Sequence, residues 1–216
     1  MLLHSVQATK SYIESRFVAA LFVSVCLVCL AGCRPKHSPV SLCGMDEWRE
    51  GDLVLRCGWG AESRLVVYQG RSSFSHIGIL HFDSVSGHWH VIHAVPGEDE
   101  PEYIKEEPVD RFFAPERAKT GAWLRVDCTD SVARATVCYA RHKVNNHVLF
   151  DNEYLLADTT HLYCTELVWR AFMSQGIDVT SGRRHEVPTI FCKEGEAIFP
   201  NDIEMSELTL FVKHFN

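Results

Sequence analysis

Residues 162–172 read LYCTELVWRAF, and the interpretation of the whole chain depends on this stretch. A polar segment at 158–160 precedes it and supplies the side chains that cap helix N-termini. The apolar residues that follow recur at helical spacing: Leu167, Val168, Ala171 and Phe172. Gly176 then offers a stop signal. The pattern predicts a helix that begins near Cys164.

A cysteine at the start of a helix is a candidate nucleophile. Free backbone N–H groups and the positive end of the helix dipole favour the thiolate over the thiol, so we expect Cys164 to be ionised readily. The same N–H groups are suited to hold an oxyanion. The alternative is that Cys164 is a small buried hydrophobic residue, which is the commoner fate of a single cysteine. The catalytic interpretation therefore requires a base.

His76 is the candidate base. Residues 74–82 read FSHIGILHF, which predicts a buried strand with a polar ring near its start, where packing gives no reason for one. Gly78 removes bulk from the same face of this strand. The alternative is a structural histidine whose hydrogen bonds are satisfied. Residues 89–95 predict a second strand that pairs with the first in antiparallel fashion and carries His93.

The remaining pattern predicts an α+β domain. The other expected strands are 53–56, 123–126 and 208–212, and the expected helices are 62–68 and 131–143. The second of these helices is expected to turn Val132, Ala135 and Tyr139 inward. Proline, glycine and charge predict a surface loop at 96–108, in which Tyr103 and Ile104 could pair briefly at a sheet edge, and a loop-rich tail at 181–200.

The first forty residues form a separate segment. Lys10 and Arg16 precede an apolar run at 17–30 that ends in the sequence LAGC at 30–33. A basic start, a short apolar core and small residues at its end predict a secretory signal. LAGC resembles the lipobox of bacterial lipoprotein signal peptides, which implies cleavage before Cys33 and acylation of its sulfur. The alternatives are an ordinary signal peptide and an uncleaved anchor.

This resemblance divides the chain into three parts. They are a signal peptide at 1–32, a lipidated Cys33 with its tether at 33–45, and a catalytic domain at 46–216. It implies a lipid-anchored protein of the bacterial cell envelope. Because Arg34 follows Cys33 where inner-membrane retention usually requires Asp, the outer membrane is favoured in a Gram-negative cell.

Composition excludes several classes of protein. Of the 216 residues, 46% are hydrophobic and 23% are charged. This hydrophobic fraction is too low for a membrane protein with several spans. From Cys33 onward, 19 basic residues stand against 27 acidic ones and form no basic patch, so nucleic acid is not an expected partner. No C-x-x-C pair occurs in this part, which argues against a zinc knuckle or a thioredoxin-type site. The oligomeric state and the disulfide state are not determined by the sequence.

Three motifs together resemble a known family. In chain order they are GDLV at 51–54, SHIGI at 75–79 and LYCTELV at 162–168. They are similar to those of the permuted papain-like amidases of the YiiX type, relatives of the NlpC-type cell-wall cysteine peptidases, and the resemblance extends from about residue 46 to 211. It implies a circularly permuted papain-like fold, with an antiparallel sheet or half-barrel packed on helices.

The resemblance also implies residue roles and an activity. Cys164 would be the nucleophile, His76 the general base and His93 the third catalytic residue, where many relatives have Glu. Tyr163 would line the substrate pocket or serve only for packing, and Glu166, in the first helical turn, would cap the helix or contact a substrate amine. The implied activity is hydrolysis of a cell-wall peptide or an N-acyl amide through an acyl-enzyme, with no cofactor and no metal. The alternative on the same fold is a lipid-directed acyltransferase or esterase.

Two rival hypotheses come from other functional classes. His88, His90 and His93 form an H-x-H-x-x-H pattern that suggests metal binding, with His81 across the hairpin. Strand alternation opposes a single site, because His88 and His90 share one face while His93 points to the other. The other rival is a non-catalytic envelope lipoprotein that binds its ligand without turnover and has an unreactive Cys164.

Overall fold

A computed structural model describes residues 37–98, 100–187 and 195–216. All of these residues belong to one compact unit, His37–Asn216. The expected signal peptide, Cys33 and Cys192 lie outside the described residues. Within the described part of the chain, no helix has both the length and the apolar character needed to cross a membrane. Five cysteines lie in that part and all of them are free: Cys43, Cys57, Cys128, Cys138 and Cys164.

The unit combines one large sheet with short helices. In chain order the elements are η1 (Met45–Glu47), β1 (Leu53–Cys57), α2 (Ala61–Gly70), β2 (His76–Asp83), β3 (His88–His93), β4 (Lys105–Pro108), α3 (Val109–Phe112), β5 (Thr120–Val126), α4 (Asp130–Asn145), α5 (Cys164–Met173), β6 (His185–Val187), β7 (Gly195–Ala197), α6 (Pro200–Glu204) and β8 (Thr209–Phe215).

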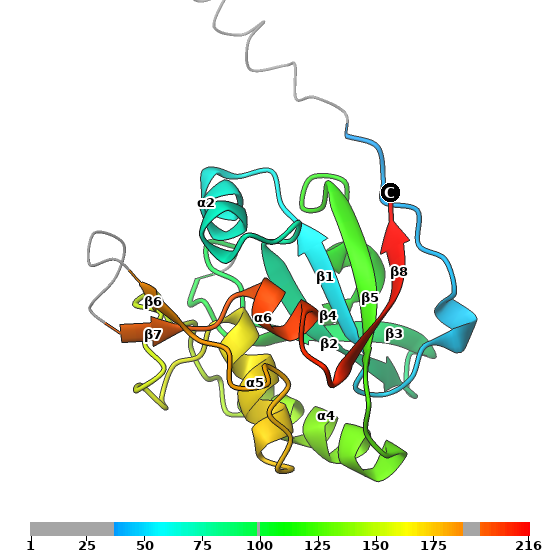
Figure 1. Ribbon diagram of the computed structural model, residues 1–216. Coiled ribbons are helices and arrows are strands. Elements are labelled where there is room, and N and C mark those ends of the chain that lie inside the picture. Colours follow the sequence, from blue (N-terminus) through cyan, green and yellow to red (C-terminus); the bar gives the residue numbers. More distant parts are fainter. Residues whose placement is uncertain (1–36, 99, 188–194) are drawn as a thin grey trace, which may run out of the picture. The chain divides into compact units, whose positions relative to one another are not determined.

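Six strands form an antiparallel sheet in the order β4-β3-β2-β1-β5-β8 (Figure 1). Strands β2 and β3 pair in antiparallel fashion, as predicted, and His81 lies opposite His90. Strands β6 and β7 form a separate two-stranded hairpin. The fold is therefore α+β, with an antiparallel sheet packed against helices, as the sequence predicts.

Side chains alternate between the two faces of the sheet and build two cores. One core contains Leu53, Ile77, Ile79 and Ile92 together with residues of α5. The other core lies on the opposite face, and its members include Val54, Leu80, Val91, Phe112 and Trp123. The period of two along β1, β2 and β3 accounts for this division. Both faces are buried along most of β1 and the first half of β2, so these segments are largely apolar.

Helix α5 packs on the sheet at β2 and against α4 (Figure 1). Its buried residues include Leu167, Val168, Ala171 and Phe172, as predicted. The buried face of α4 was predicted wrongly: Ala133, Thr136, Val137 and Ala140 are buried instead of Val132, Ala135 and Tyr139. The small and β-branched residues of α4 therefore lie against the core, while the ring of Tyr139 covers its edge.

The GDLV motif has a structural explanation. Gly51 has φ of 77°, and a Cβ at this position would lie 3.0 Å from the Cβ of Ala133. Asp52 is buried and accepts hydrogen bonds from Trp123 Nε1 at 2.9 Å and from both the Nε and NH2 atoms of Arg125. The motif therefore joins β1 to β5 and α4, and does not belong to the candidate active site.

Two regions expected to be loops contain regular structure. The acidic 96–108 segment ends in β4, which pairs with β3 through Ile92 and Glu106. The 181–200 tail contains β6, β7 and the start of α6. The loop prediction for 96–108 missed β4 because this strand is short and polar, and tertiary pairing rather than an apolar period specifies it. The expected edge pairing of Tyr103 is present as a bridge to Leu149.

Candidate active site

Cys164 is the first residue of α5, and Tyr163 is its N-cap. The thiol is half-buried. Three backbone N–H groups lie against its sulfur: those of Thr165, Ile77 and Cys164 itself. The N–H of Ile77 comes from β2, so the helix start lies directly beside the residue that follows His76. The fold thus brings together two segments separated by more than eighty residues of sequence.

The resting thiol is not the readily formed thiolate expected from the sequence. Burial raises the pKa of Cys164 to about 11, although the N–H groups of Thr165 and Ile77 oppose this shift. Desolvation of an anion outweighs a few backbone dipoles when the group is enclosed. The expectation of easy ionisation is therefore corrected: the structure favours a neutral thiol in the absence of substrate.

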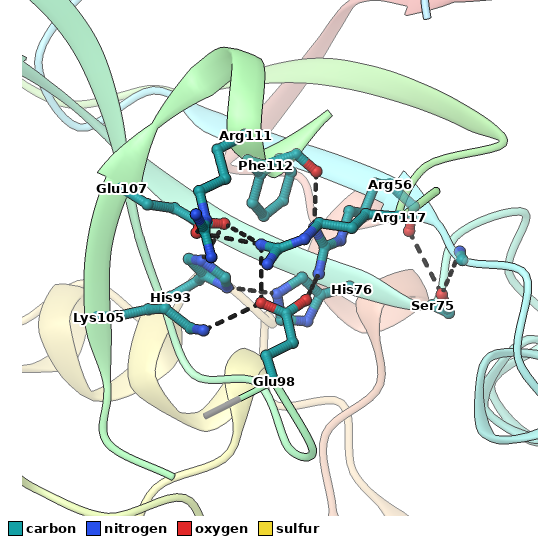
Figure 2. Close-up of polar contacts among 11 residues, drawn as sticks. Arg56, Ser75, His76, His93, Glu98, Lys105, Glu107, Arg111, Phe112 and Arg117 are labelled. Carbon is teal, nitrogen blue, oxygen red and sulfur yellow. Dashed lines mark hydrogen bonds and ion pairs between the residues drawn. The ribbon is translucent and has the colours of Figure 1, made fainter. Parts of the chain in front are cut away.

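His76 is the first residue of β2, and its ring is backed by two further side chains (Figure 2). The Nε2 atom of His76 lies 2.8 Å from Nδ1 of His93. The Nε2 atom of His93 lies 3.1 Å from Oε1 of Glu107 on β4. These contacts occupy both ring nitrogens of His93 and leave Nδ1 of His76 as the ring atom available for chemistry. The ring of His76 stacks on Phe112, with centroids 5.5 Å apart.

A network of charged side chains surrounds this histidine pair (Figure 2). Glu107 accepts hydrogen bonds from Arg111 Nε at 3.0 Å and from Arg117 NH1 at 2.9 Å. Arg117 also contacts Glu98 at 2.8 Å, and Glu98 contacts the buried Arg56 at 3.1 Å. Each of the two carboxylates is thus held by at least two cations, and the network fixes the position of Glu107.

Burial and this network determine the protonation of the relay. The pKa of His76 lies well below its usual range because the ring is desolvated and Arg56 is nearby. Burial also lowers the pKa of His93 to about 4, although its hydrogen bond to Glu107 acts in the opposite direction. Burial acts to raise the pKa of Glu107, but His93 and the cations prevail and lower it to about 2. At neutral pH both rings are therefore neutral and Glu107 is ionised.

Cys164 and His76 open into the same pocket of about 660 Å³. No hydrogen bond joins the sulfur to the ring among the described residues, and catalytic contacts often tighten only when substrate binds. The pocket surface is mainly apolar and is formed by residues of α2, 94–96, 150–163 and 197–200, and the charged side chains of Arg56, Glu98 and Arg117 also line it. A pocket of this size and character accommodates a small organic ligand or a short peptide segment.

The two predicted pocket residues lie in different environments. Tyr163 lines the pocket, and its hydroxyl oxygen accepts a hydrogen bond from the backbone N–H of Ile198 at 2.9 Å. Glu166 is fully buried and is not one of the residues that line the pocket. Its Oε1 accepts from Arg170 Nε at 2.7 Å, while burial raises its pKa to about 7. This position suits a role in stabilising the helix start.

The histidines of the metal-binding hypothesis do not converge. His93 is part of the buried relay, whereas His90 lies 3.5 Å from Oε1 of Glu106. His81 contacts Glu50 through Nδ1 and approaches Glu106 through Nε2. Across residues 37–98, 100–187 and 195–216, no group of three or more His, Cys, Asp or Glu side chains is arranged to hold a metal ion.

Comparisons with known proteins identify a structural neighbour. No protein-family model matches the chain, and no curated protein is similar to it in sequence. A solved structure described as metalloprotein yiiX from Escherichia coli O157:H7 is similar, with a TM-score of 0.62 and 16% sequence identity. The match covers 76% of this chain and 96% of that one. The likeness shows a YiiX-like fold. At this identity it does not show an activity.

Glu107 is the site residue that the sequence analysis missed. It lies in a KEEP segment at 105–108, whose charges and terminal proline are typical of a surface loop. The signal that could have identified it is the buried His93 on the neighbouring strand, because a buried imidazole requires a polar partner for each ring nitrogen. The sequence analysis also missed Arg56 and Arg117, which complete the network.

Proposed function

We propose that the protein is a cysteine-dependent hydrolase that cleaves amide bonds through an acyl-enzyme. The observation that supports this most strongly is the shared pocket of Cys164 and His76, in which the histidine is backed by a buried His93–Glu107 pair. A nucleophile, a base and groups that orient the base are the parts required for acyl transfer. A structural histidine would not need its remaining ring nitrogen beside a pocket that also contains a thiol.

The fold supports a more specific assignment. We propose that it is a circularly permuted papain-like fold, in which the histidine strand β2 precedes the cysteine helix α5. Supporting observations are the antiparallel sheet packed on α5, the thiol at the first position of that helix, and the YiiX-like neighbour. In this arrangement His93 takes the place of the third catalytic residue.

The first half of the reaction is acylation. As the sulfur of Cys164 attacks the amide carbonyl carbon, its proton passes to Nδ1 of His76 and a C–S bond forms. The carbonyl oxygen becomes an oxyanion, which backbone N–H groups at the start of α5 can stabilise. Because thiol and imidazole begin neutral, proton transfer accompanies attack, as in general-base catalysis. The imidazolium then protonates the leaving nitrogen, the C–N bond breaks, and a thioester remains.

The second half is hydrolysis of the thioester. His76 accepts a proton from water as the water oxygen attacks the thioester carbonyl. The C–S bond then breaks, the sulfur regains the proton from His76, and the carboxylic acid leaves. Glu107 balances the positive charge that spreads over the two rings at each stage. The mechanism uses no metal, and the side chains of the described residues do not fit one even though the neighbour is described as a metalloprotein.

The expected substrates are cell-wall peptides or N-acyl amides of an envelope. The pocket supports them through its mixture of aromatic walls, including Trp59 and Tyr163, with polar groups such as Asn152.

We also propose anchoring through acyl chains on Cys33. The first described residue, His37, stacks on Trp59 with centroids 3.7 Å apart, and only three residues separate it from Cys33. Loss of the Cys33→Ser variant from the membrane fraction is the result that the proposed anchoring predicts, and unchanged membrane binding contradicts it.

The test of the activity compares two cysteine variants on one substrate panel. Cys138 is exposed and free on α4, so Cys138→Ala is a matched control for Cys164→Ala. On a panel of muropeptides and N-acyl amino acids, we expect amide hydrolysis to be abolished in Cys164→Ala and unchanged in Cys138→Ala. Hydrolysis that survives in Cys164→Ala would overturn the proposal.

A further inference from the structure

We infer that Glu107 is a positioning residue for the proposed reaction: acting through His93, it fixes which nitrogen of His76 carries the proton. This inference rests on the proposed function and extends the catalytic machinery by one strand. The relay runs from β4 through β3 to β2 in the order Glu107, His93, His76, with contacts of 3.1 and 2.8 Å. The side chain farthest from the thiol therefore controls the base.

The position of the protons follows from the donors available. An ionised carboxylate only accepts hydrogen bonds, so Nε2 of His93 must donate to Glu107. A neutral His93 then has an unprotonated Nδ1, which accepts from Nε2–H of His76. A neutral His76 consequently has a lone pair on Nδ1, the one ring atom free to act on the thiol. If the donors and acceptors of these two hydrogen bonds were exchanged, Nδ1 of His76 would carry a proton and could not act as the base.

The cations around Glu107 maintain this direction. Arg111 donates to Oε2, and Arg117 donates to both carboxylate oxygens, at 2.9 and 3.1 Å. They keep the carboxylate ionised and oriented while Oε1 remains in reach of His93. Glu107 is only 5% exposed, so water does not compete for its oxygens. A purely structural ion pair would not require an imidazole of a neighbouring strand as a third partner.

The most informative change is Glu107→Gln. The new side chain would have a single carbonyl oxygen, which the two arginines would hold, and its NH2 group would then face Nε2 of His93. That group donates, so the relay would reverse and place a proton on Nδ1 of His76. Glu106→Gln is the matched control: Glu106 is the adjacent residue of β4, and it contacts His90 and Arg141 rather than the relay.

The first readout is the imidazole ¹⁵N spectrum of the full chain, which distinguishes the two neutral tautomers without reference to activity. We expect the Nε2–H tautomer of His76 in the native protein and in Glu106→Gln, and the Nδ1–H tautomer in Glu107→Gln. The native spectrum alone also tests the inference, because Nδ1–H on His76 in the unmodified protein would overturn it even if the variant failed to fold.

The second readout is the acylation rate of Cys164 by p-nitrophenyl acetate. Loss of a carboxylate next to a catalytic imidazole costs about 10⁴-fold through the wrong tautomer, and Glu107 acts through one additional ring. We therefore expect a decrease of roughly 10- to 100-fold in Glu107→Gln and a change of less than about twofold in Glu106→Gln. Unchanged tautomer and rate in Glu107→Gln would show that the residue is only structural. An unreactive native Cys164 with the expected tautomer would instead contradict the proposed function.

Discussion

At the scale of the residue, burial determines the chemistry of the site. The sequence places Cys164 at a helix start, where local dipoles favour a thiolate, but sequence alone does not reveal how far the thiol is enclosed. Desolvation raises the pKa of Cys164 to about 11 and lowers that of His76, so the resting pair is neutral. The backbone N–H groups at the helix start do lower the pKa of Cys164, as expected, but by less than desolvation raises it.

The neutral pair predicts a particular pH dependence. The base must be unprotonated to act, and the pKa of His76 lies well below its usual value of 6.5 because the ring is buried near Arg56. We therefore expect the rate of Cys164 acylation to stay nearly constant as the pH falls from 7.5 to 6.5, the usual pKa of histidine, and to decrease only at lower pH. A stopped-flow pH–rate profile provides the test, and an acid limb centred at or above 6.5 would contradict it.

At the scale of the element, most strands and helices follow from the sequence and the site does so only in part. Period-two and period-3.6 patterns locate β1, β2, β3, β5 and β8 and the helices α2, α4 and α5, and they place Cys164 and His76 at the starts of their elements. The sequence does not reveal β4, which is polar and is held by pairing with β3. Because Glu107 lies on β4, in a segment expected to be a surface loop, the carboxylate of the relay was not predicted.

Close packing of β2 against β3 predicts a stability effect at Gly78. A Cβ there would lie 2.3 Å from Cγ1 of Val91 and 3.1 Å from Cβ of His93, so a methyl group cannot fit without moving β3. We expect Gly78→Ala to lower the free energy of unfolding by about 1–3 kcal/mol, measured by urea denaturation. Gly60→Ala is the control, because a Cβ there meets nothing within 4 Å. Equal stability of the two variants would refute the packing argument.

At the scale of the whole molecule, the buried relay makes stability dependent on pH. His93 has a pKa of about 4 in the folded protein, against 6.5 for an unperturbed histidine. Between these values the unfolded chain binds a proton that the folded protein does not, so stability rises with pH and is lost as the pH falls from 6.5 to 4. Glu107, with a pKa of about 2 against 4.5, adds a further loss between pH 4.5 and 2.

This linkage predicts acid sensitivity well above the pH at which carboxylates titrate. The difference between the folded and unfolded pKa of His93 lowers the free energy of unfolding by roughly 3 kcal/mol once the pH has fallen to 4. We expect the urea midpoint to decrease steadily between pH 6.5 and 4.5, and to decrease less steeply in His93→Gln. The same slope in both proteins would contradict the assignment of this acid sensitivity to His93.

The central claim is that His76 activates Cys164, and site-resolved acylation tests it most directly. The protein is treated with p-nitrophenyl acetate at pH 7, and acetylation of each cysteine is followed by peptide mass spectrometry, with exposed Cys138 as the internal reference. We predict that Cys164 is acetylated faster than Cys138 although the pKa of Cys164 is raised. We also predict that His76→Ala slows the acetylation of Cys164 roughly 10²- to 10⁴-fold and leaves the acetylation of Cys138 unchanged. Acetylation of Cys164 that is slower than that of Cys138 and indifferent to His76 would contradict the claim.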